Sequence, residues 1–224
     1  MNYSIIQVAT NNYDQIFDCG DYNSINNLLF TDRQYNFKNW KIYNVNSNKN
    51  FPFDTVFSIR WNPFMDANTD YIVWIDGSIK INSSIKKYIE QMINGNYDFA
   101  VLTHFSRNNV FDEYNEWCKI RNYNKNIAFK WLKYFEENGL DIKNSGLYQP
   151  GIMIFKNNNL MKNFCSDMIK ELHYLDKFHF ERLDQTIMTM LLKTKYKNIK
   201  LLELPYTTYM STELCIIHSA HPMK

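Results

Sequence analysis

Short apolar runs alternate along this chain with segments in which apolar residues recur at helical spacing. Runs of strand length and composition predict strands over residues 4–9, 27–30, 40–45, 71–75, 98–103, 147–155 and 199–204. Helical spacing predicts helices over residues 83–94, 160–175 and 182–192, and two more within residues 110–135. This alternation favours an α/β fold, with helices covering both faces of a mixed, mostly parallel sheet.

Two segments are harder to interpret from their pattern. Residues 55–65 carry mixed signals, because Pro63 must lie in the first turn of a helix or break it. Pro150 and Gly151 are expected to interrupt the strand over residues 147–155.

Length, charge and cysteine usage narrow the class of protein. The 224 residues fit one large α/β domain, and we find no internal repeat and no low-complexity linker. A net charge of +2, with no dense Lys/Arg run, argues against a nucleic-acid groove. The four cysteines form no C-x-x-C pair, which argues against zinc and favours reduced thiols. The sequence shows neither a signal peptide nor a membrane-spanning stretch, so we expect a cytoplasmic protein, its oligomeric state open.

The most informative segment is the predicted strand over residues 71–75, which runs into Asp76, Gly77 and Ser78. Ligands of α/β proteins bind beyond the carboxyl ends of the strands. A carboxylate there is placed to hold a divalent cation, the usual bridge to a phosphate-bearing substrate. The alternative is that Asp76 caps a turn or a helix start, and this segment alone does not separate the two.

Polar side chains also follow other predicted strands, and a parallel sheet would gather them at one edge. They are residues 10–14, Asp32, residues 104–107 and the tail that begins at His218. Mixed Asp and His ligation suits Mn²⁺ or Mg²⁺ better than a structural zinc. For His218, which follows the apolar run over residues 214–217, simple surface exposure is the alternative.

Two further segments admit a functional and a structural interpretation. Asp184 and Gln185 open a predicted helix, where Asp184 either compensates the helix dipole or faces a cleft. In a cleft these two side chains would accept hydrogen bonds from sugar hydroxyls or act as a base. The loop with Tyr148 and Gln149 suits a sugar-binding wall or a plain connection. The Walker, Rossmann and Gly-x-Ser-x-Gly motifs are absent from the sequence.

The order and spacing of several motifs resemble a known family. They are Thr10-Asn11-Asn12-Tyr13-Asp14, Phe30-Thr31-Asp32, Trp40-Lys41-Ile42, Arg60, residues 71–81, His104, Glu113, Gly146-Leu147-Tyr148, Gly151 and Arg182-Leu183-Asp184-Gln185. In these the chain resembles the nucleotide-diphospho-sugar transferases of GT-A type. It is most similar to the glycosyltransferase-like family of plant, bacterial and viral polysaccharide proteins, formerly classed as a domain of unknown function.

The resemblance implies one GT-A-like domain over residues 1–224. Its nucleotide-binding half would span about residues 1–105, and its donor-sugar and acceptor half about residues 106–224. It also implies an enzyme of polysaccharide biosynthesis that moves a sugar from a nucleotide-diphosphate sugar, UDP favoured, to a glycan or other hydroxyl acceptor. Mn²⁺ or Mg²⁺ would assist the transfer.

The resemblance assigns roles to individual residues. The donor would contact Thr10, Asn12, Tyr13, Asp32, Arg60, Asp76, Gly77, Ser78 and Gln185. The metal would be held by Asp76, Ser78 and His218, the acceptor or sugar by His104, Tyr148 and Gln149, and catalysis would fall to Asp184 and Glu113. The chain departs from the family in carrying Ser78 where many relatives have a second acid, and Asn62-Pro63 where a basic residue is expected.

Two rival functions stay open at the level of sequence. A catalytically silent nucleotide- or sugar-binding module would bind its ligand without turnover. A sugar nucleotidyltransferase would carry a Gly-rich, basic phosphate loop near its start, which residues 10–14 lack.

Overall fold

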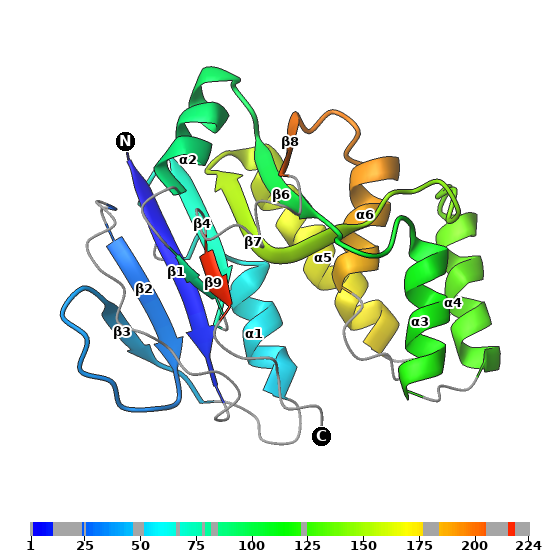
Figure 1. Ribbon diagram of the computed structural model, residues 1–224, viewed down its shortest axis with the longest axis horizontal. Coiled ribbons are helices and arrows are strands. Elements are labelled where there is room, and N and C mark those ends of the chain that lie inside the picture. Colours follow the sequence, from blue (N-terminus) through cyan, green and yellow to red (C-terminus); the bar gives the residue numbers. More distant parts are fainter. Residues whose placement is uncertain are drawn as a thin grey trace.

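The computed structural model describes residues 2–10, 24, 26–46, 52–65, 68–77, 79–81, 85–121, 125–176, 184–204 and 215–217. Seven strands of these residues form one sheet in the order β3-β2-β1-β4-β7-β6-β8 (Figure 1). They are β1 (Tyr3–Ala9), β2 (Asn26–Thr31), β3 (Lys41–Asn44), β4 (Tyr71–Asp76), β6 (Phe99–Thr103), β7 (Tyr148–Lys156) and β8 (Leu201–Leu204). The short strands β5 (Ile79–Ile81) and β9 (Cys215–Ile217) pair with each other as a separate ribbon.

Helices lie on both sides of this sheet. They are α1 (Pro52–Arg60), α2 (Ile85–Asn94), α3 (Val110–Arg121), α4 (Lys125–Glu137), α5 (Asn159–Asp176) and α6 (Asp184–Thr194). Figure 1 shows α3 to α6 gathered at one end of the molecule, away from β2 and β3. The predicted α/β fold, a mostly parallel sheet with helices on both faces, is confirmed.

Alternating side chains of the strands build two separate cores. Ile6, Ile72 and Trp74 point to the face that α1, α5 and α6 cover, in one cluster with Ile59 and Ile187. Their neighbours in sequence point to the opposite face, where α2 packs on the sheet. Strands buried on both faces read as continuous apolar runs, which is why the sequence pattern identified them.

Strand β7 runs against its neighbours β4 and β6, whereas the other pairs within the sheet are parallel. The start of β7, rather than its end, therefore lies at the edge where β1, β2, β4 and β6 finish. This topology brings Tyr148 and Gln149 to the same edge as Asp76.

The structure differs from the expected elements in three places. Residues 52–60, rather than 55–65, form helix α1, and Pro63 lies beyond its end, which agrees with the alternative that this proline breaks the helix. Pro150 and Gly151 do not end β7, but the register between β6 and β7 shifts there, since Leu102 pairs with Gln149 and Val101 with Met153. The β5–β9 ribbon was not anticipated. No helix among the described residues combines the length and apolarity that crossing a membrane requires.

Candidate active site

The carboxyl ends of the central strands finish level with one another. Ala9 pairs with Thr31 on one side of β1, and Val8 pairs with Asp76 on the other. Thr10 and Asp32 follow directly on β1 and β2, and Asp76 is the last residue of β4. We predicted that polar side chains after these strands share one edge of the sheet, and the structure confirms this for Thr10, Asp32 and Asp76.

One guanidinium joins two carboxylates at this edge. Arg60, in the last turn of α1, donates from Nη2 to Oδ1 of Asp76 over 2.5 Å and from Nη1 to Oδ2 of Asp184. The side chains of Arg60 and Asp184 are 9% and 5% exposed, whereas that of Asp76 is 33% exposed. The cluster therefore has a buried end at α6 and an open end at β4.

Neighbouring side chains hold Asp76 in place. Residues two apart on a strand share a face, so Asp76 lies on the same side of the sheet as Trp74, whose indole N–H donates to Oδ1 over 3.0 Å. The Arg60 guanidinium lies 5.0 Å from the Trp74 ring centre, within range of a cation–π contact. On β1, the amide of Gln7 donates to the backbone carbonyls of Asp76 and Ile79 over 3.2 and 2.7 Å, which fixes the turn after β4.

Burial and neighbouring charges have opposite effects on the pKa values of Asp184 and Arg60. Burial raises the pKa of the Asp184 carboxyl, and the Arg60 guanidinium counteracts this rise. Burial acts to lower the pKa of Arg60, but the charges of Asp76 and Asp184 outweigh it and raise that pKa. Arg60 is therefore a permanent cation that neutralises a carboxylate that would be costly to bury alone.

Asp76 is one of the three residues that were predicted to hold a divalent cation. Both contacts of the carboxylate fall on Oδ1, and Oδ2 has no hydrogen bond to the described residues. Ile217, the last residue of β9, pairs with Ile79, so this ribbon lies beside the turn that follows Asp76. Ser78 and His218, the other predicted ligands, lie outside the described residues. Within the described part of the chain, no group of three or more His, Cys, Asp or Glu side chains could hold a metal ion.

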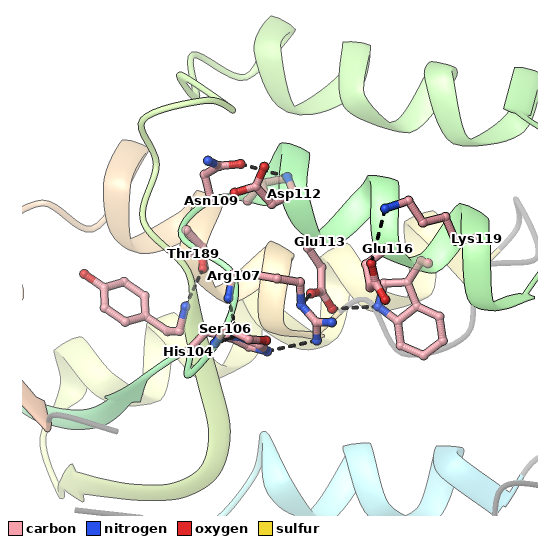
Figure 2. Close-up of polar contacts among 12 residues, drawn as sticks. His104, Ser106, Arg107, Asn109, Asp112, Glu113, Glu116, Lys119 and Thr189 are labelled. Atoms are coloured by element: carbon pink, nitrogen blue, oxygen red, sulfur yellow. Dashed lines mark hydrogen bonds and ion pairs between the residues drawn. The ribbon is translucent and has the colours of Figure 1, made fainter. Parts of the chain in front are cut away.

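A second polar network lies in the loop between β6 and α3 (Figure 2). Nδ1 of His104 accepts the backbone N–H groups of Ser106 and Arg107 over 3.2 and 3.1 Å. The guanidinium of Arg107 lies 3.0 Å from Nε2 of His104 and forms an ion pair with Glu113 on α3. Glu113, only 1% exposed, also accepts the indole N–H of Trp117 over 2.6 Å. This network ties the loop to the first turns of α3.

Burial disfavours the charged forms of both His104 and Glu113 in this network, and it therefore shifts their pKa values in opposite directions. Burial, with the positive charge of Arg107, lowers the pKa of His104 to about 4, so that the ring is neutral at pH 7. Burial raises the pKa of Glu113, against the effects of Arg107 and Trp117, and the charge of Asp184 adds to the rise. The effect of the Asp184 charge on the pKa of Glu113 indicates that the two networks are close enough to interact.

We expect His104→Asn to make the protein less sensitive to acid. The pKa of His104 is lower in the folded chain than its usual value near 6.5, so the unfolded chain binds this proton more readily. The neutral ring's contribution is thus present above about pH 6.5 and is lost as the pH falls towards 4, by about 2–3 kcal/mol. Asparagine cannot take up the proton, yet its oxygen can accept the same backbone N–H groups.

Urea denaturation at pH 7.0, 5.5 and 4.5 measures this effect. The stability lost between pH 7.0 and 4.5 should be smaller for His104→Asn than for the parent. His173→Asn, at an exposed position of α5, is the matched control and should follow the parent. Equal losses in the parent and in His104→Asn would show that His104 is not held neutral in this way.

The structure places the other predicted site residues as follows. Gly77 is buried directly after Asp76, and Asp32 forms an ion pair with Arg33 over 3.9 Å. Tyr148 is 2% exposed, and its hydroxyl donates to Glu203 of β8 over 2.6 Å, so this side chain is turned away from the Arg60 cluster. Asn12 and Tyr13 lie outside the described residues.

Sequence reasoning missed Gln7 and Trp74, which hold the backbone and the carboxylate of Asp76. A polar residue inside a strand that is buried along its whole length is the signal for Gln7, since such a side chain needs hydrogen-bond partners. The cluster joins the two predicted halves of the domain, because Arg60 comes from the first half and Asp184 from the second.

A family model of the TOD1/MUCI70 glycosyltransferase-like domain matches residues 26–172, well over half of the chain. The chain therefore belongs to the TOD1/MUCI70 glycosyltransferase-like family. No curated protein sequence matches it significantly.

Solved structures share the fold at low identity. Mouse xyloside xylosyltransferase 1, in its apo form, superposes with a TM-score of 0.51 and 11% identity, covering 92% of this chain and 86% of that one. S. aureus TarS matches over only part of each chain, with a TM-score of 0.34 and 13% identity. The match covers 47% of this chain and 36% of that one. The xylosyltransferase likeness supports the GT-A-type fold.

Proposed function

We propose that this chain is a glycosyltransferase that moves a sugar from a nucleoside-diphosphate sugar to a hydroxyl of a glycan or another acceptor. The UDP-sugars are the favoured donors, and Mn²⁺ or Mg²⁺ assists the reaction. Membership of the glycosyltransferase-like family supports glycosyl transfer in general. We locate the active site from one observation: the Arg60 guanidinium lies between the carboxylates of Asp76 and Asp184 at the carboxyl edge of the sheet.

The donor sugar fits the inner end of this cluster. Nε of Arg60 and Oε1 of Gln185 are buried and have no hydrogen-bond partner among the described residues. Buried polar atoms without a partner are rare in proteins and often mark where a ligand or an ordered water completes a site. One donor and one acceptor, beside the carboxylate of Asp184, are the groups that bind sugar hydroxyls. We therefore assign Arg60, Asp184 and Gln185 to the donor sugar.

The nucleotide then extends over the ends of β1 and β2. Thr10 and Asp32 follow these strands, and a carboxylate at Asp32 suits the hydroxyls or N–H groups of a nucleoside. Asn12 and Tyr13 complete this part of the proposal from sequence alone, with Tyr13 stacking on the base.

The diphosphate lies over the open end of the cluster in this proposal. Asp76, with Ser78 and His218, would hold the divalent cation, and Gly77 would let the backbone approach the phosphates. A bound cation stabilises the negative charge that develops as the nucleoside diphosphate leaves. Arg60 adds a fixed positive charge on the same side of the sheet.

Asp184 is the group we propose to act on the reacting sugar, as a hydrogen-bond acceptor or as a base. Glu113 has two protein partners and is almost fully buried, so we propose that it positions the loop after β6. His104 begins this loop and Gln149 pairs with Leu102 near the end of β6, and in this proposal both face the acceptor side of the site.

A thermal-shift panel tests the proposed function. Nucleoside diphosphates and their sugars are added to the purified chain with and without Mn²⁺, and a ligand that binds only the folded state raises the melting temperature. We expect UDP to stabilise the chain more than GDP, and only when Mn²⁺ is present. Release of UDP from UDP-sugars without acceptor then reports turnover. Binding without release would favour a silent module, and a flat panel would contradict the proposal.

A further inference from the structure

A hollow lies between the end of α6 and the edge strand β8. Its volume of about 390 Å³ falls within the range of about 300–1,000 Å³ that is usual for ligand pockets. Tyr148, at the start of β7, forms one wall. Lys193, in the last turn of α6, and Lys197 line the helix side, and Leu201 and Glu203 line the side of β8. These residues belong neither to the Arg60 cluster nor to the network around His104.

The carboxylate of Glu203 is fixed through one of its oxygens. The Tyr148 hydroxyl donates to Oε1 of Glu203 over 2.6 Å. Burial, with the hydrogen bond to Glu203 and its charge, raises the pKa of Tyr148, so the phenol keeps its proton. Oε2 of Glu203 has no hydrogen bond to the described residues, and the side chain is exposed. The second oxygen is therefore available to a ligand in the hollow.

Two ammonium groups line the opposite side. Nζ of Lys193 lies 5.2 Å from the centre of the Tyr148 ring, a cation–π contact that holds this side chain beside the wall. Within the described part of the chain, Lys193 and Lys197 form no ion pair, whereas Lys195 between them pairs with Asp167 over 2.6 Å. Lys193 and Lys197 are thus hydrogen-bond donors without a carboxylate partner.

The turn that closes the hollow is held in a defined conformation. Tyr196 donates its backbone N–H to the carbonyl of Leu191 over 2.8 Å and its hydroxyl to Asp167 of α5 over 2.7 Å. The backbone N–H of Ile199 donates to the carbonyl of Tyr196 over 3.0 Å. Tyr196 and Ile199 also line the hollow and are largely buried. A pocket that is already formed loses little conformational freedom when a ligand binds.

The lining favours one chemical class of ligand. An inorganic anion would be attracted by Lys193 and Lys197 but repelled by Glu203. An apolar ligand would deprive the same charged groups of water and give them no partner. A sugar ring suits both sides, because its hydroxyl groups can donate to Oε2 of Glu203 and accept from the two ammonium groups. Its C–H groups can pack on Leu201.

We propose that this hollow binds one pyranose residue of a neutral glycan, as a second sugar site apart from the donor. Lys193 is nine residues beyond Asp184 on α6, so the two residues are separated by about 14 Å along the helix. The binding itself does not depend on the proposed function. Its role does rest on that function: the hollow holds a second part of the acceptor glycan, which raises the local concentration of the glycan near the donor.

Saturation-transfer NMR measures this binding without requiring turnover. The probes are cellohexaose, xylohexaose, mannohexaose and maltohexaose, each added to the full chain without UDP or metal. We expect at least one of them to bind. Glu203→Gln should weaken its affinity by about 10-fold, the loss of a hydrogen bond to a charged group, although glutamine still accepts the Tyr148 hydroxyl. Lys193→Met should weaken it as well, and inorganic phosphate should not displace it.

Glu136→Gln, at an exposed position of α4, and Lys200→Met, which lies outside the hollow, are the matched controls. They should bind like the parent, and all four variants should keep the parental melting temperature and UDP shift. Three results would overturn the inference: no binding of any probe by the parent, parental affinity in both Glu203→Gln and Lys193→Met, or displacement by phosphate. Glycan binding in a chain that neither binds UDP nor releases it from UDP-sugars would support the second site and contradict the proposed function.

Discussion

Replacing Arg60 with methionine is expected to lower the free energy of unfolding at pH 7 by about 3–5 kcal/mol. The change leaves the carboxylate of Asp184 without its cation, on a side chain that is only 5% exposed. Methionine keeps the unbranched apolar stem of arginine, so most packing against Phe57 and Trp74 is retained and the loss reports on the charge. Urea denaturation of the parent and the variant measures the difference.

Acid should relieve part of this loss. In Arg60→Met the pKa of Asp184 rises further, because burial still raises it and the guanidinium that lowered it is gone. A carboxyl with a higher pKa in the folded than in the unfolded chain costs stability as the pH rises above its unfolded value, near 3.9. The gap between variant and parent should therefore be smaller at pH 5 than at pH 7.

The double variant Arg60→Met/Asp184→Asn is the control for this interpretation. The double variant removes the Asp184 charge that Arg60→Met leaves buried without a partner. It should therefore be more stable than Arg60→Met alone, and its free energy of unfolding should be nearly independent of pH in this range. An Arg60→Met variant as stable as the parent at pH 7 would show that the two carboxylates do not depend on this cation.

Asp76→Asn is expected to reduce donor turnover by about 100-fold or more, with a change of less than about 1 kcal/mol in the free energy of unfolding. Its side chain is 33% exposed, so solvent screens the pair with Arg60, and asparagine still accepts hydrogen bonds from Arg60 and Trp74. What the variant loses is the charge that we propose holds the divalent cation. Initial rates of UDP release across a Mn²⁺ titration measure the effect.

Asp184→Asn provides the comparison for Asp76→Asn. Because we assign Asp184 to the sugar and Asp76 to the cation, Asp184→Asn should reduce turnover more than it reduces nucleotide affinity. Asp76→Asn should reduce turnover and also nucleotide affinity. The affinity loss should be confined to the part that depends on Mn²⁺. Parental turnover in both variants would place the site elsewhere in the chain.

The central strands of this fold were predictable because most of their residues are apolar and buried on both faces. Every residue of β1 is buried, and five of the six in β4 are. Helix α1 was not predictable in the same way, since its apolar residues do not concentrate on one side and its fixed position depends on packing. Ile59 and Trp61, at its end, are buried in the core under the sheet.

The site was predictable only as far as strand ends determine it. Asp76 was found because a carboxylate ends a buried strand, and its approach to Asp32 and Thr10 follows from the parallel pairing of β1, β2 and β4. The pairing of Arg60 with Asp184 joins residues 124 positions apart and leaves no local pattern. Short strands such as β5 and β9 carry too few residues to show a period at all.

The β5–β9 ribbon bears on the order in which the chain folds. Ile79 cannot find its partner Ile217 until nearly all of the described elements have been synthesised, and closing so long a loop is entropically costly. Contacts of high sequence separation form slowly, whereas β1, β2 and β4 can assemble from the first part of the chain. The turn after Asp76 would therefore gain its last neighbour late, so a nascent chain acquires its core before its site.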